Sequence, residues 1–368
     1  MDIIVGSQYG DCGKGRITDY LCSTGRYDVC ARVNGSDNAG HTVTLGEDKF
    51  AFNQIPVGAV HGMKCVITRG CMVDLERLNA EIERVERAVR VYNRSDDWSL
   101  YIDSRCHVKT QAHRDRDIQE EKERTNPIGT TLSGNGPAYA DKYARFNQRV
   151  CDIDMIRYPN VVRKAMIVDT SLLEHSRCLV EGAHGIMLDI DHGGVYPFVT
   201  SSACTAAAAC HSLGVSPKMV GRIIGVMKPY LTRVGAGAFP TEILEETTAS
   251  IIRERGHEYG TNTKRPRRIG WLDLPALKYA VRVSGIEELA ICKTDILSYL
   301  DSVDVCTGYE GIAFGFIPPK DKEYQAVEPI YESIKWDGFG LTRLISLIEK
   351  SVGIPVAIVT NLESILLR

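Results

Sequence analysis

The sequence has no long apolar run and little net charge. None of its apolar stretches approaches the roughly 20 residues that a membrane-spanning helix needs, so we expect no membrane partner. The formal net charge of -3 argues against a protein that coats nucleic acid, and we expect no nucleic-acid partner. The first residues, MDIIVGSQYG, lack the charged and apolar regions of a signal peptide. We therefore expect the protein in the cytoplasm, or in the host cytoplasm if it is viral.

Paired cysteine motifs, repeats and low-complexity linkers are also missing. The 12 cysteines form no CxxC pair and no metal-type cluster with histidine, and in 368 residues they are too dilute for a disulfide scaffold. We expect reduced thiols, mostly in the core, and no zinc site. With no repeat and no linker, the simplest organisation is one domain over residues 1–368 with long functional loops.

Short β-branched runs alternate with helical patterns along the chain. This alternation predicts an α/β fold with a mostly parallel central sheet, helices on both faces and long loops. The predicted strands are Ile3–Val5, Val29–Val33, Cys65–Thr68, Cys178–Val180, Ile223–Met227, Leu289–Cys292 and Val356–Val359. Predicted helices follow Asp74 as N-cap, run from Thr241 to Gly256 and run from Leu341 to Val352. Glycine, threonine and arginine gather in the predicted loops 34–42, 128–145, 181–205 and 259–270.

The segment GSQYGDCGKGRI, residues 6–17, follows the first predicted strand and has features of a phosphate-binding loop. Its glycines allow backbone N–H groups to approach a phosphate, and Lys14 adds a positive charge. A P-loop, however, has four residues between its first glycine and Gly-Lys, followed by a hydroxyl that holds magnesium. Here the spacing is longer and Gly15 supplies no hydroxyl. Asp11 is the hard oxygen ligand in this loop, so it binds magnesium or performs acid–base chemistry, unless the segment is only a glycine-rich turn.

Three further polar loops carry possible binding groups. NGSDNAGHT, residues 34–42, contains His41, either a general acid or a histidine that satisfies a turn carbonyl. IGTTLSGNGP, residues 128–137, offers hydroxyls and backbone donors to a phosphate, or forms an ordinary surface loop. EGAHGIMLDIDHGGVYPFVTSS, residues 181–202, has apolar residues, two histidines and hydroxyls that suit a planar ligand.

The segment YGTNTKRPRRIGWLD, residues 259–273, is the strongest cationic signal. Pro266 favours an extended backbone, so Arg265 and Arg267 should point the same way. Two guanidinium groups on one face can bind a dicarboxylate or a phosphate. A nucleic-acid patch and a solvated cluster are the alternatives. The tripeptide Lys293-Thr-Asp295 follows a predicted strand, and an aspartate there can accept hydrogen bonds from a guanine edge.

In this order, the segments resemble adenylosuccinate synthetase. The similarity includes GSQYGDCGKG, NAGHT, IGTT with GPAYADKYAR, EGAHG, PFVTSS, TRVGAGAFPTE, RPRRIGWLD and KTDILS, and it extends to about residue 300. The resemblance implies a P-loop-NTPase-related fold and a carbon–nitrogen ligase. Such an enzyme couples L-aspartate to C6 of a 6-oxopurine nucleotide through a 6-phosphoryl intermediate, with hydrolysis of a nucleoside triphosphate and with Mg²⁺.

The resemblance also implies roles for individual residues. Asp11 would take the N1 proton and bind magnesium with the carbonyl of Gly40. His41 would protonate or stabilise the transferring phosphoryl group, and Lys14 would hold charge on the phosphates. The implied purine nucleotide site comprises Asn38, Thr130, Thr131, Arg145, His184 and Thr200, with Arg145 reaching the other subunit's nucleotide in a homodimer. The implied aspartate site comprises Thr263, Arg265 and Arg267. The implied triphosphate site comprises Gly13, Lys14, Gly15, Lys293 and Asp295.

The chain also departs from the family pattern. Cys12 replaces a glutamate, His184 replaces a glutamine that faces the purine 6-oxygen, and Leu132-Ser133 replaces Gly-Arg. Asn262 and Lys264 interrupt a Thr-Thr-Gly, and the segment that helps to read guanine is not recognisable in IVTNLESILLR. The chain is shorter than the usual bacterial enzyme. These departures gather around the purine and the base of the triphosphate.

A compact branch of the family, carried by phages with 2-aminoadenine in their DNA, acts on dGMP and can use ATP. The sequence is more similar to that branch, so we expect dGMP, L-aspartate and ATP as substrates, with dATP or GTP possible as donors. The alternative within the family is the housekeeping enzyme, which uses IMP and GTP, and the retained Asp295 favours GTP. From other classes, a GTP-binding regulatory protein would leave the paired arginines and His41 without a shared purpose. A nucleic-acid-binding module that uses Lys264 to Arg268 is disfavoured by the acidic balance of the chain.

Overall fold

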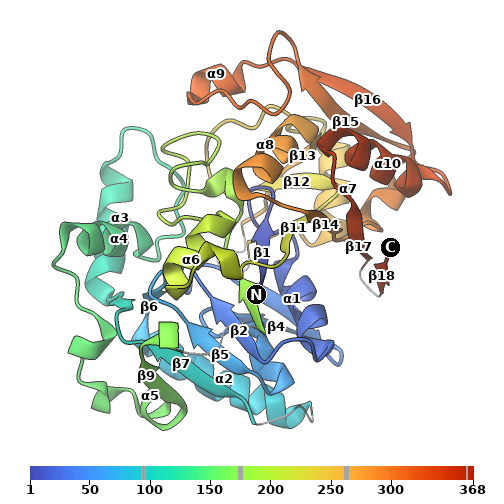
Figure 1. Ribbon diagram of the computed structural model, residues 1–368. Coiled ribbons are helices and arrows are strands. Elements are labelled where there is room, and N and C mark those ends of the chain that lie inside the picture. The colour runs from blue at the N-terminus through green and yellow to red at the C-terminus, as the bar shows by residue number, and fades with distance from the viewer. Residues whose placement is uncertain (93, 95–96, 173–176, 261–264, 362–363) are drawn as a thin grey trace. The chain divides into compact units, whose positions relative to one another are not determined.

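The computed structural model describes residues 1–92, 94, 97–172, 177–260, 265–361 and 364–368 (Figure 1). The described residues form two compact units. The first comprises Met1–Ile4, Lys14–Ala183 and Ser201–Gly221, and the second comprises Val5–Gly13, His184–Thr200 and Arg222–Arg368. The single domain expected from the sequence stays a prediction.

A parallel sheet is the centre of the first unit. Its strands lie in the order β1 (Asp2–Gly6), β10 (Cys178–Glu181), β2 (Val29–Arg32), β5 (Lys64–Ile67), β7 (Ser99–Asp103) and β9 (Ala165–Val168). The β-branched runs predicted β1, β2, β5 and β10 because these strands are almost entirely buried, so their sequences are continuously apolar. β7 and β9 were not predicted, and both have partly exposed residues.

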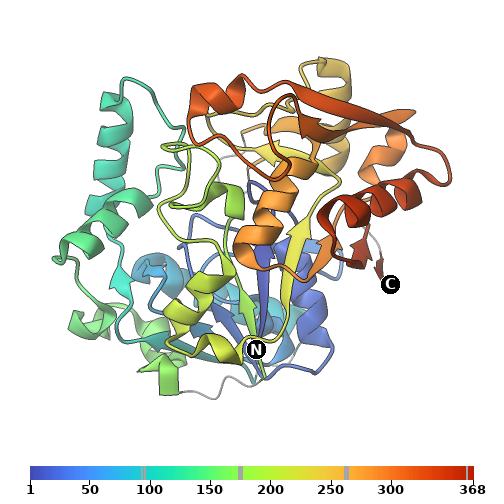
Figure 2. The same cartoon turned by 45° about the horizontal axis from the view of Figure 1, so that its top comes forward.

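Helices of the first unit follow from amphipathic patterns and caps. Their bounds are α1 (Lys14–Ser23), α2 (Leu75–Val91), α3 (Gln111–Glu123), α4 (Asn135–Ala144), α5 (Pro159–Lys164) and α6 (Ala206–Leu213). α2 begins after Asp74 as predicted, since this side chain accepts a hydrogen bond from the backbone N–H of Arg77 at 3.2 Å. The expectation of a loop over residues 128–145 was wrong for α4, which lies beside α3 in both views (Figures 1 and 2).

Shorter strands complete the first unit. β3 (His41–Leu45) and β4 (Asp48–Phe52) form an antiparallel hairpin, and β6 (Met72–Val73) pairs with β8 (His107–Val108) in parallel. The buried face of α2 packs with residues of β5 and β7 in one apolar cluster. This core holds the loops that follow β2 and β5 on a rigid base.

The second unit contains two sheets. In one, β11 (Ile223–Met227), β14 (Glu288–Ile291) and β17 (Val356–Thr360) are parallel, and β18 (Ile365–Leu367) is antiparallel to β17. The other has the order β12 (Tyr230–Arg233), β13 (Arg268–Asp273), β15 (Ser302–Tyr309) and β16 (Pro329–Lys335). The helices are α7 (Glu246–Gly256), α8 (Leu274–Ser284), α9 (Asp321–Gln325) and α10 (Gly340–Val352). The α/β class with mostly parallel strands is thereby confirmed.

The predicted start of α7 at Thr241 was wrong. Glu242 forms a β-bridge with Gly270, and the helix begins only at Glu246. The side chain of Glu245 caps it by accepting hydrogen bonds from the N–H groups of Thr247 and Thr248 at 2.9 and 2.7 Å. The start of α7 is therefore set by the cap at Glu245, because the chain before it still pairs with β13.

All 12 cysteines are free thiols, and all except Cys151 are buried, as the sequence predicted. Within the described residues, no helix is both long and apolar enough to cross a bilayer.

Candidate active site

The loop between β1 and α1 is anchored firmly within the second unit. The N–H of Ser7 donates to the carbonyl of Val226 at 3.0 Å, and the amide of Gln8 donates to the carbonyl of Lys228 at 2.8 Å. A Cβ atom on Gly13, whose φ is +95°, would lie 2.7 Å from Sγ of Cys292. Only glycine fits this close approach. Asp11 is carried on this fixed loop, and its side chain remains 35% exposed.

Packing within the first unit explains why residue 15 is a glycine, at the position where a P-loop has a residue with a hydroxyl. A Cβ atom on Gly15 would lie 2.7 Å from the carbonyl oxygen of Thr42 and 2.9 Å from its nitrogen. A serine or threonine there would displace the backbone at the start of β3. Gly15 therefore lacks a hydroxyl because α1 packs closely against β3. Lys14, the first residue of α1, is buried.

His41 is held by two charged residues from neighbouring parallel strands. Arg32 ends β2 and Glu181 ends β10, and the two are Cα partners across the ladder. Nδ1 of His41 contacts the Glu181 carboxylate and lies 2.8 Å from Nη1 of Arg32, while Arg32 pairs with Glu181 at 3.1 Å. All three side chains are buried. Nε2 of His41 has no partner among the residues that the structure describes.

The electrostatics of this triad favour a neutral His41 beside an ionised Glu181. Burial, then the positive charge of Arg32, lowers the pKa of His41 to about 4. Burial acts to raise the pKa of Glu181, but His41, Arg32 and the N–H of Val57 outweigh it, so this pKa falls to about 2. An ionised Glu181 accepts hydrogen bonds only, so Nδ1–H of His41 points to it. The opposite nitrogen, Nε2, is then free to accept or shuttle a proton.

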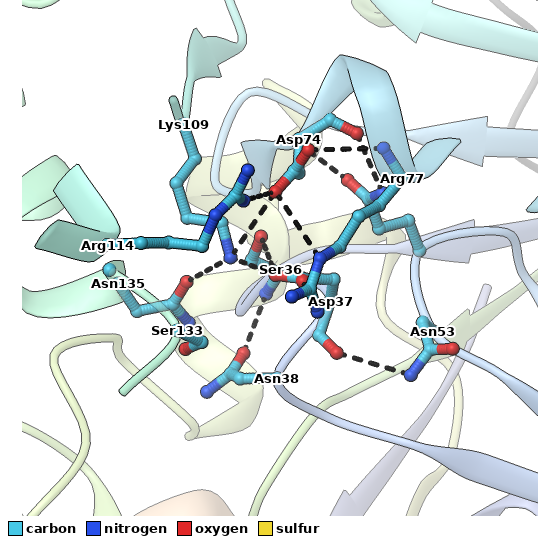
Figure 3. Close-up of polar contacts among 12 residues, drawn as sticks. Ser36, Asp37, Asn38, Asn53, Asp74, Arg77, Lys109, Arg114, Ser133 and Asn135 are labelled. Atoms are coloured by element: carbon cyan, nitrogen blue, oxygen red, sulfur yellow. Dashed lines mark hydrogen bonds and ion pairs between the residues drawn. The ribbon is translucent and has the colours of Figure 1, made fainter. Parts of the chain in front are cut away.

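A network of charges, with Asp37 and Lys109 buried and Arg77 at its exposed edge, supports the loop that carries Asn38 (Figure 3). The ammonium of Lys109, which is fully buried, contacts Asp37 and lies 3.3 Å from Oδ1 of Asn135. Nη1 of Arg77 pairs with the other oxygen of Asp37 at 2.6 Å. Burial lowers the pKa of Lys109 although Asp37 acts to raise it. Lys109 thus ties the 34–42 loop to the first residue of α4.

The loop before α4 carries two threonines that were predicted to bind the nucleotide. The first bonds within the protein, and the second is exposed. Oγ1 of Thr130 donates to Asp117 at 3.3 Å, whereas Thr131 is exposed and its hydroxyl lies 3.0 Å from that of Ser133. Asn38 is half-buried in the neighbouring loop, and its Oδ1 accepts from the N–H of Ser36 at 3.2 Å. Arg145 ends α4 in a left-handed conformation with φ 69° and is exposed.

In the second unit, Glu258 gathers three cations around one buried carboxylate. Its oxygens accept from Lys228 at 3.0 Å, from Lys293 at 2.7 Å and from Arg267 at 2.5 Å. The hydroxyl of Tyr230 donates to it at 2.7 Å. Burial acts to raise the pKa of Glu258, but the three cations hold it far below its ordinary value. Burial also lowers the pKa of Lys228 to about 8.

Arg267 connects this buried carboxylate to Asp11. Its Nη2 lies 3.0 Å from Oδ2 of Asp11, while its Nη1 bonds Glu258. Arg267 is 5% exposed, whereas Arg265 is exposed, so the two predicted aspartate ligands have different surroundings. The third predicted ligand, Thr263, lies outside the described residues.

The residues predicted to contact the two nucleotides differ from one another in burial and in hydrogen bonding. Lys293 bonds Glu258 and donates to the carbonyl of Gly256 at 2.6 Å. Oδ1 of Asp295 is buried and has no partner within the described part of the chain. His184 and Thr200 are both half-buried, and the N–H of Thr200 donates to the carbonyl of Leu188 at 2.7 Å. Cys12 is fully buried, so its thiol packs in the core.

The donor atoms present fit a hard cation such as Mg²⁺ only in part. Among the described residues, no group of three or more His, Cys, Asp or Glu side chains could hold a metal ion. The carboxylate of Asp11 is partly exposed, and Mg²⁺ commonly binds one or two carboxylates together with phosphate oxygens and water. Asp11 is therefore a suitable ligand in a site completed by a substrate. Asp11 and Gly40 belong to different units, and their joint binding of a metal stays a prediction.

Unusual backbone conformations coincide with the predicted site residues. Six non-glycine residues within the described ranges have positive φ: Asp11, Leu132, Arg145, His184, His257 and Lys293. Four of them were assigned site roles from the sequence, Leu132 is a departure from the family pattern, and His257 directly precedes Glu258. Strained backbone of this kind persists where the surroundings enforce it, often at functional sites.

Sequence reasoning missed the charged residues that support the site. Arg32, Glu181, Lys109, Lys228 and Glu258 received no role, although all are buried. Glu181 directly follows the apolar strand Cys178–Val180, and a charged residue at the end of a buried parallel strand was an available signal.

Comparison with known proteins identifies relatives over nearly the whole chain. The family model described as adenylosuccinate synthetase matches residues 3–158 and 154–361. The adenylosuccinate synthetase of Thermoplasma volcanium is 36% identical over 98% of this chain and 94% of its own, and that of Halothermothrix orenii is 38% identical over 97% and 95%.

Two solved structures have the same fold. The fully ligated adenylosuccinate synthetase of Plasmodium falciparum has a TM-score of 0.90 at 29% identity and covers 100% of this chain and 99% of its own. The succinoaminodeoxyadenylate synthetase of cyanophage S-2L, bound to dGMP and dATP, has a TM-score of 0.72 at 22% identity and covers 100% and 94%. The second likeness shows the fold alone. By its sequence, this chain belongs to the adenylosuccinate synthetase family of carbon–nitrogen ligases.

Proposed function

We propose that the protein joins L-aspartate to C6 of IMP with hydrolysis of GTP, which yields adenylosuccinate. The observation that carries this proposal is the ion pair at 3.0 Å between Asp11 and Arg267. It joins the proposed base to the proposed aspartate loop within one unit. The relatives named adenylosuccinate synthetase, which match 97–98% of the chain, support the same reaction.

The first step activates the purine oxygen. Asp11 accepts the N1 proton of the 6-oxopurine, and the resulting oxyanion attacks the γ-phosphorus of the triphosphate, so that the diphosphate leaves. Nε2 of His41 would face the transferring group and, once protonated, would donate a hydrogen bond to it, while Glu181 and Arg32 hold the other ring nitrogen. Lys14 adds positive charge near the phosphates. Enzymes of this family use Mg²⁺ and GTP, and the metal would bind Asp11 and supply charge neutralisation.

The second step displaces the phosphate. The aspartate amine attacks C6, the 6-phosphoryl group leaves as inorganic phosphate, and the amine loses a proton. Arg265 and Arg267, with Thr263, would bind the aspartate carboxylates. Arg267 would have to exchange its contact with Asp11 for substrate, or bind both, while Glu258 keeps its other edge fixed.

The purine nucleotide would be held by Asn38, Thr131 and Thr200. Arg145 would reach the nucleotide of a second subunit in a homodimer, in agreement with its exposure and its left-handed backbone at the end of α4. Thr130 would position this loop for the nucleotide, because its hydroxyl donates to Asp117 and its N–H donates to Glu121. Lys293 and Asp295 would recognise the base of the triphosphate.

A second candidate is dGMP as the purine substrate with ATP or dATP as the donor, the specificity that we expected from the sequence. His184, with φ +59°, stands where the family has a glutamine facing the purine, and this observation favours a changed purine site. The relatives named adenylosuccinate synthetase favour the housekeeping reaction with IMP and GTP, so IMP is our first candidate substrate. Oδ1 of Asp295, which has no partner among the residues that the structure describes, also suits a guanine donor.

A substrate matrix tests both candidates. IMP, GMP and dGMP are each combined with GTP, ATP and dATP, and phosphate release is measured with and without L-aspartate. We expect aspartate-dependent release with IMP and GTP. Release with dGMP and none with IMP would select the second candidate, and the absence of aspartate-dependent release in every combination would refute the ligase.

A further inference from the structure

A cavity of about 200 Å³ lies in the first unit, apart from the residues assigned to substrates above. It is formed where the parallel strands β5 and β7 end, between those strand ends and the helices α4 and α6. The carboxyl ends of parallel strands are where ligands most often bind in α/β sheets. The lining residues are Arg69, Gly70, Arg105, His107, Lys142 and His211.

The acidic groups at this cavity are already used by its two arginines. Nη2 of Arg69 lies 2.9 Å from Asp103 and 3.0 Å from Asp169, and Arg105 pairs with the same two carboxylates. Asp103 also accepts from the N–H and the hydroxyl of Thr170 at 3.0 and 2.7 Å. Neither carboxylate is left to neutralise a further cation.

Lys142 is that further cation. Its ammonium donates to the carbonyl of Arg69 at 3.2 Å, and no carboxylate pairs with it in the described part of the chain. Burial lowers the pKa of Lys142. Even with both histidines neutral, the three cations exceed the two aspartates by one charge. A bound anion would offset this excess in a site that is partly removed from water.

Two nitrogen atoms beside this excess positive charge could form hydrogen bonds with an anion. Nε of Arg69 and Nδ1 of His107 are buried and have no hydrogen-bond partner among the described residues. Together with the ammonium of Lys142, they come from three separate segments of the chain. Charge-assisted hydrogen bonds of this type are the strong ones in proteins, and they suit the oxygens of a phosphate.

We propose that this cavity binds a phosphate group, either as inorganic phosphate or as the end of a phosphate monoester. A water molecule occupies about 30 Å³ of liquid, so the cavity has room for an ion with several oxygens. Lys142 would pair with the phosphate charge, and the side chains of Arg69 and His107 would turn toward the ion to donate hydrogen bonds, since Nε of Arg69 and Nδ1 of His107 are buried beside the cavity. The proposal does not depend on which purine or triphosphate the enzyme uses.

Calorimetric titration tests the site. Sodium phosphate and ribose 5-phosphate are titrated separately into the wild-type enzyme at constant ionic strength, and then into Lys142→Gln and His107→Gln. Lys122→Gln is the matched control, because Lys122 is an exposed lysine on the neighbouring helix α3. We expect the wild type and Lys122→Gln to bind equally, and the two cavity variants to bind at least tenfold more weakly.

The two titrants separate the sources of the phosphate. Binding of both assigns a phosphate monoester site, and binding of inorganic phosphate alone assigns the free ion. Equal affinities in the wild type and both cavity variants would overturn the proposal, as would no binding of either titrant. If Lys142→Gln does not fold, as judged by its thermal unfolding, His107→Gln carries the comparison. A crystal structure of the wild type in phosphate should place the anion within hydrogen-bond distance of Lys142, and a side chain of a second subunit filling the cavity would refute the site.

Discussion

Nη1 of Arg267 donates to Oε2 of Glu258 at 2.5 Å, so the guanidinium is fixed from its buried side. The same guanidinium presents Nη2 to Asp11 at 3.0 Å. Glu258 is fully buried and Asp11 is exposed, so one planar group joins a core carboxylate to a solvent-facing one. The fixed geometry of an arginine suits this task better than a flexible lysine would.

Replacement of Glu258 by glutamine should impair both stability and turnover. The amide keeps the size of the side chain but removes the charge that compensates Lys228, which is fully buried. Removing one partner of a buried ion pair costs about 3–5 kcal/mol. We expect a loss of that order in chemical unfolding, with turnover reduced at least tenfold because Arg267 is no longer fixed beside Asp11.

The double variant Glu258→Gln/Lys228→Met separates the two effects. It removes the buried carboxylate charge together with Lys228, the one fully buried cation among its three partners, so we expect most of the lost stability to return. Turnover should stay low, and the KM for aspartate should be raised in both the single and the double variant, because Arg267 lacks its anchor in each. Recovery of wild-type kinetics in the double variant would mean that Glu258 serves only folding.

The seven strands predicted from β-branched runs are all present because parallel strands buried on both faces have continuous apolar sequences. The antiparallel strand β16 escaped prediction since most of its residues are exposed. The sequence predicted a start of α7 that is too early, because a helical pattern does not show that Glu242 pairs with Gly270.

The site was predictable where one motif contains the chemistry. Asp11, His41 and Arg267 stand in short polar motifs that resemble a known family. The partner of His41 lies 140 residues away at Glu181, and Lys109 lies 72 residues from Asp37. Such pairs form only when distant strands become neighbours, so local spacing carries no sign of them. Whether Asp11 and His41 act in one site stays a prediction, since each belongs to a different unit.

Asp11→Asn should leave the fold intact and nearly abolish turnover. The side chain is exposed, so its loss costs little burial, but the amide cannot accept the N1 proton. Loss of a general base typically lowers the rate about 10²- to 10⁴-fold. Phosphate release with IMP, GTP and aspartate is the measurement. Asp301→Asn, an exposed aspartate of the same unit outside the predicted loops, is the control and should keep wild-type turnover. Substantial activity without Asp11 would mean that another base is used.

The His41 triad should make stability depend on pH in the acidic range. The folded-state pKa of His41, about 4, is below the ordinary value of 6.5, so the unfolded chain binds the extra proton between these values. Stability is therefore fully present above pH 6.5 and is lost as the pH falls toward 4. Glu181, with a pKa lowered to about 2 from 4.5, adds a second loss below pH 4.5.

His41→Asn tests this window. The free energy of unfolding, measured with urea from pH 7 to pH 4, should fall less steeply in the variant than in the wild type. His192→Asn replaces an exposed histidine and should keep the wild-type slope. Equal slopes for the wild type and His41→Asn would show that the triad does not shift the pKa of His41.

Gly15→Ser should damage the enzyme although it restores the hydroxyl of a P-loop. Its Cβ atom would lie 2.7 Å from the carbonyl oxygen of Thr42, an atom of the backbone that cannot rotate away. Overpacking of this kind typically costs about 1–3 kcal/mol, and here it would displace the residue next to His41. We expect a lower free energy of unfolding and a reduced kcat. Gly338→Ser is the control, because a Cβ atom there has no neighbour within 4 Å among the atoms of the described chain. An active, stable Gly15→Ser variant would show that α1 and β3 can move apart, and the loop would then tolerate the P-loop residue that its packing now excludes.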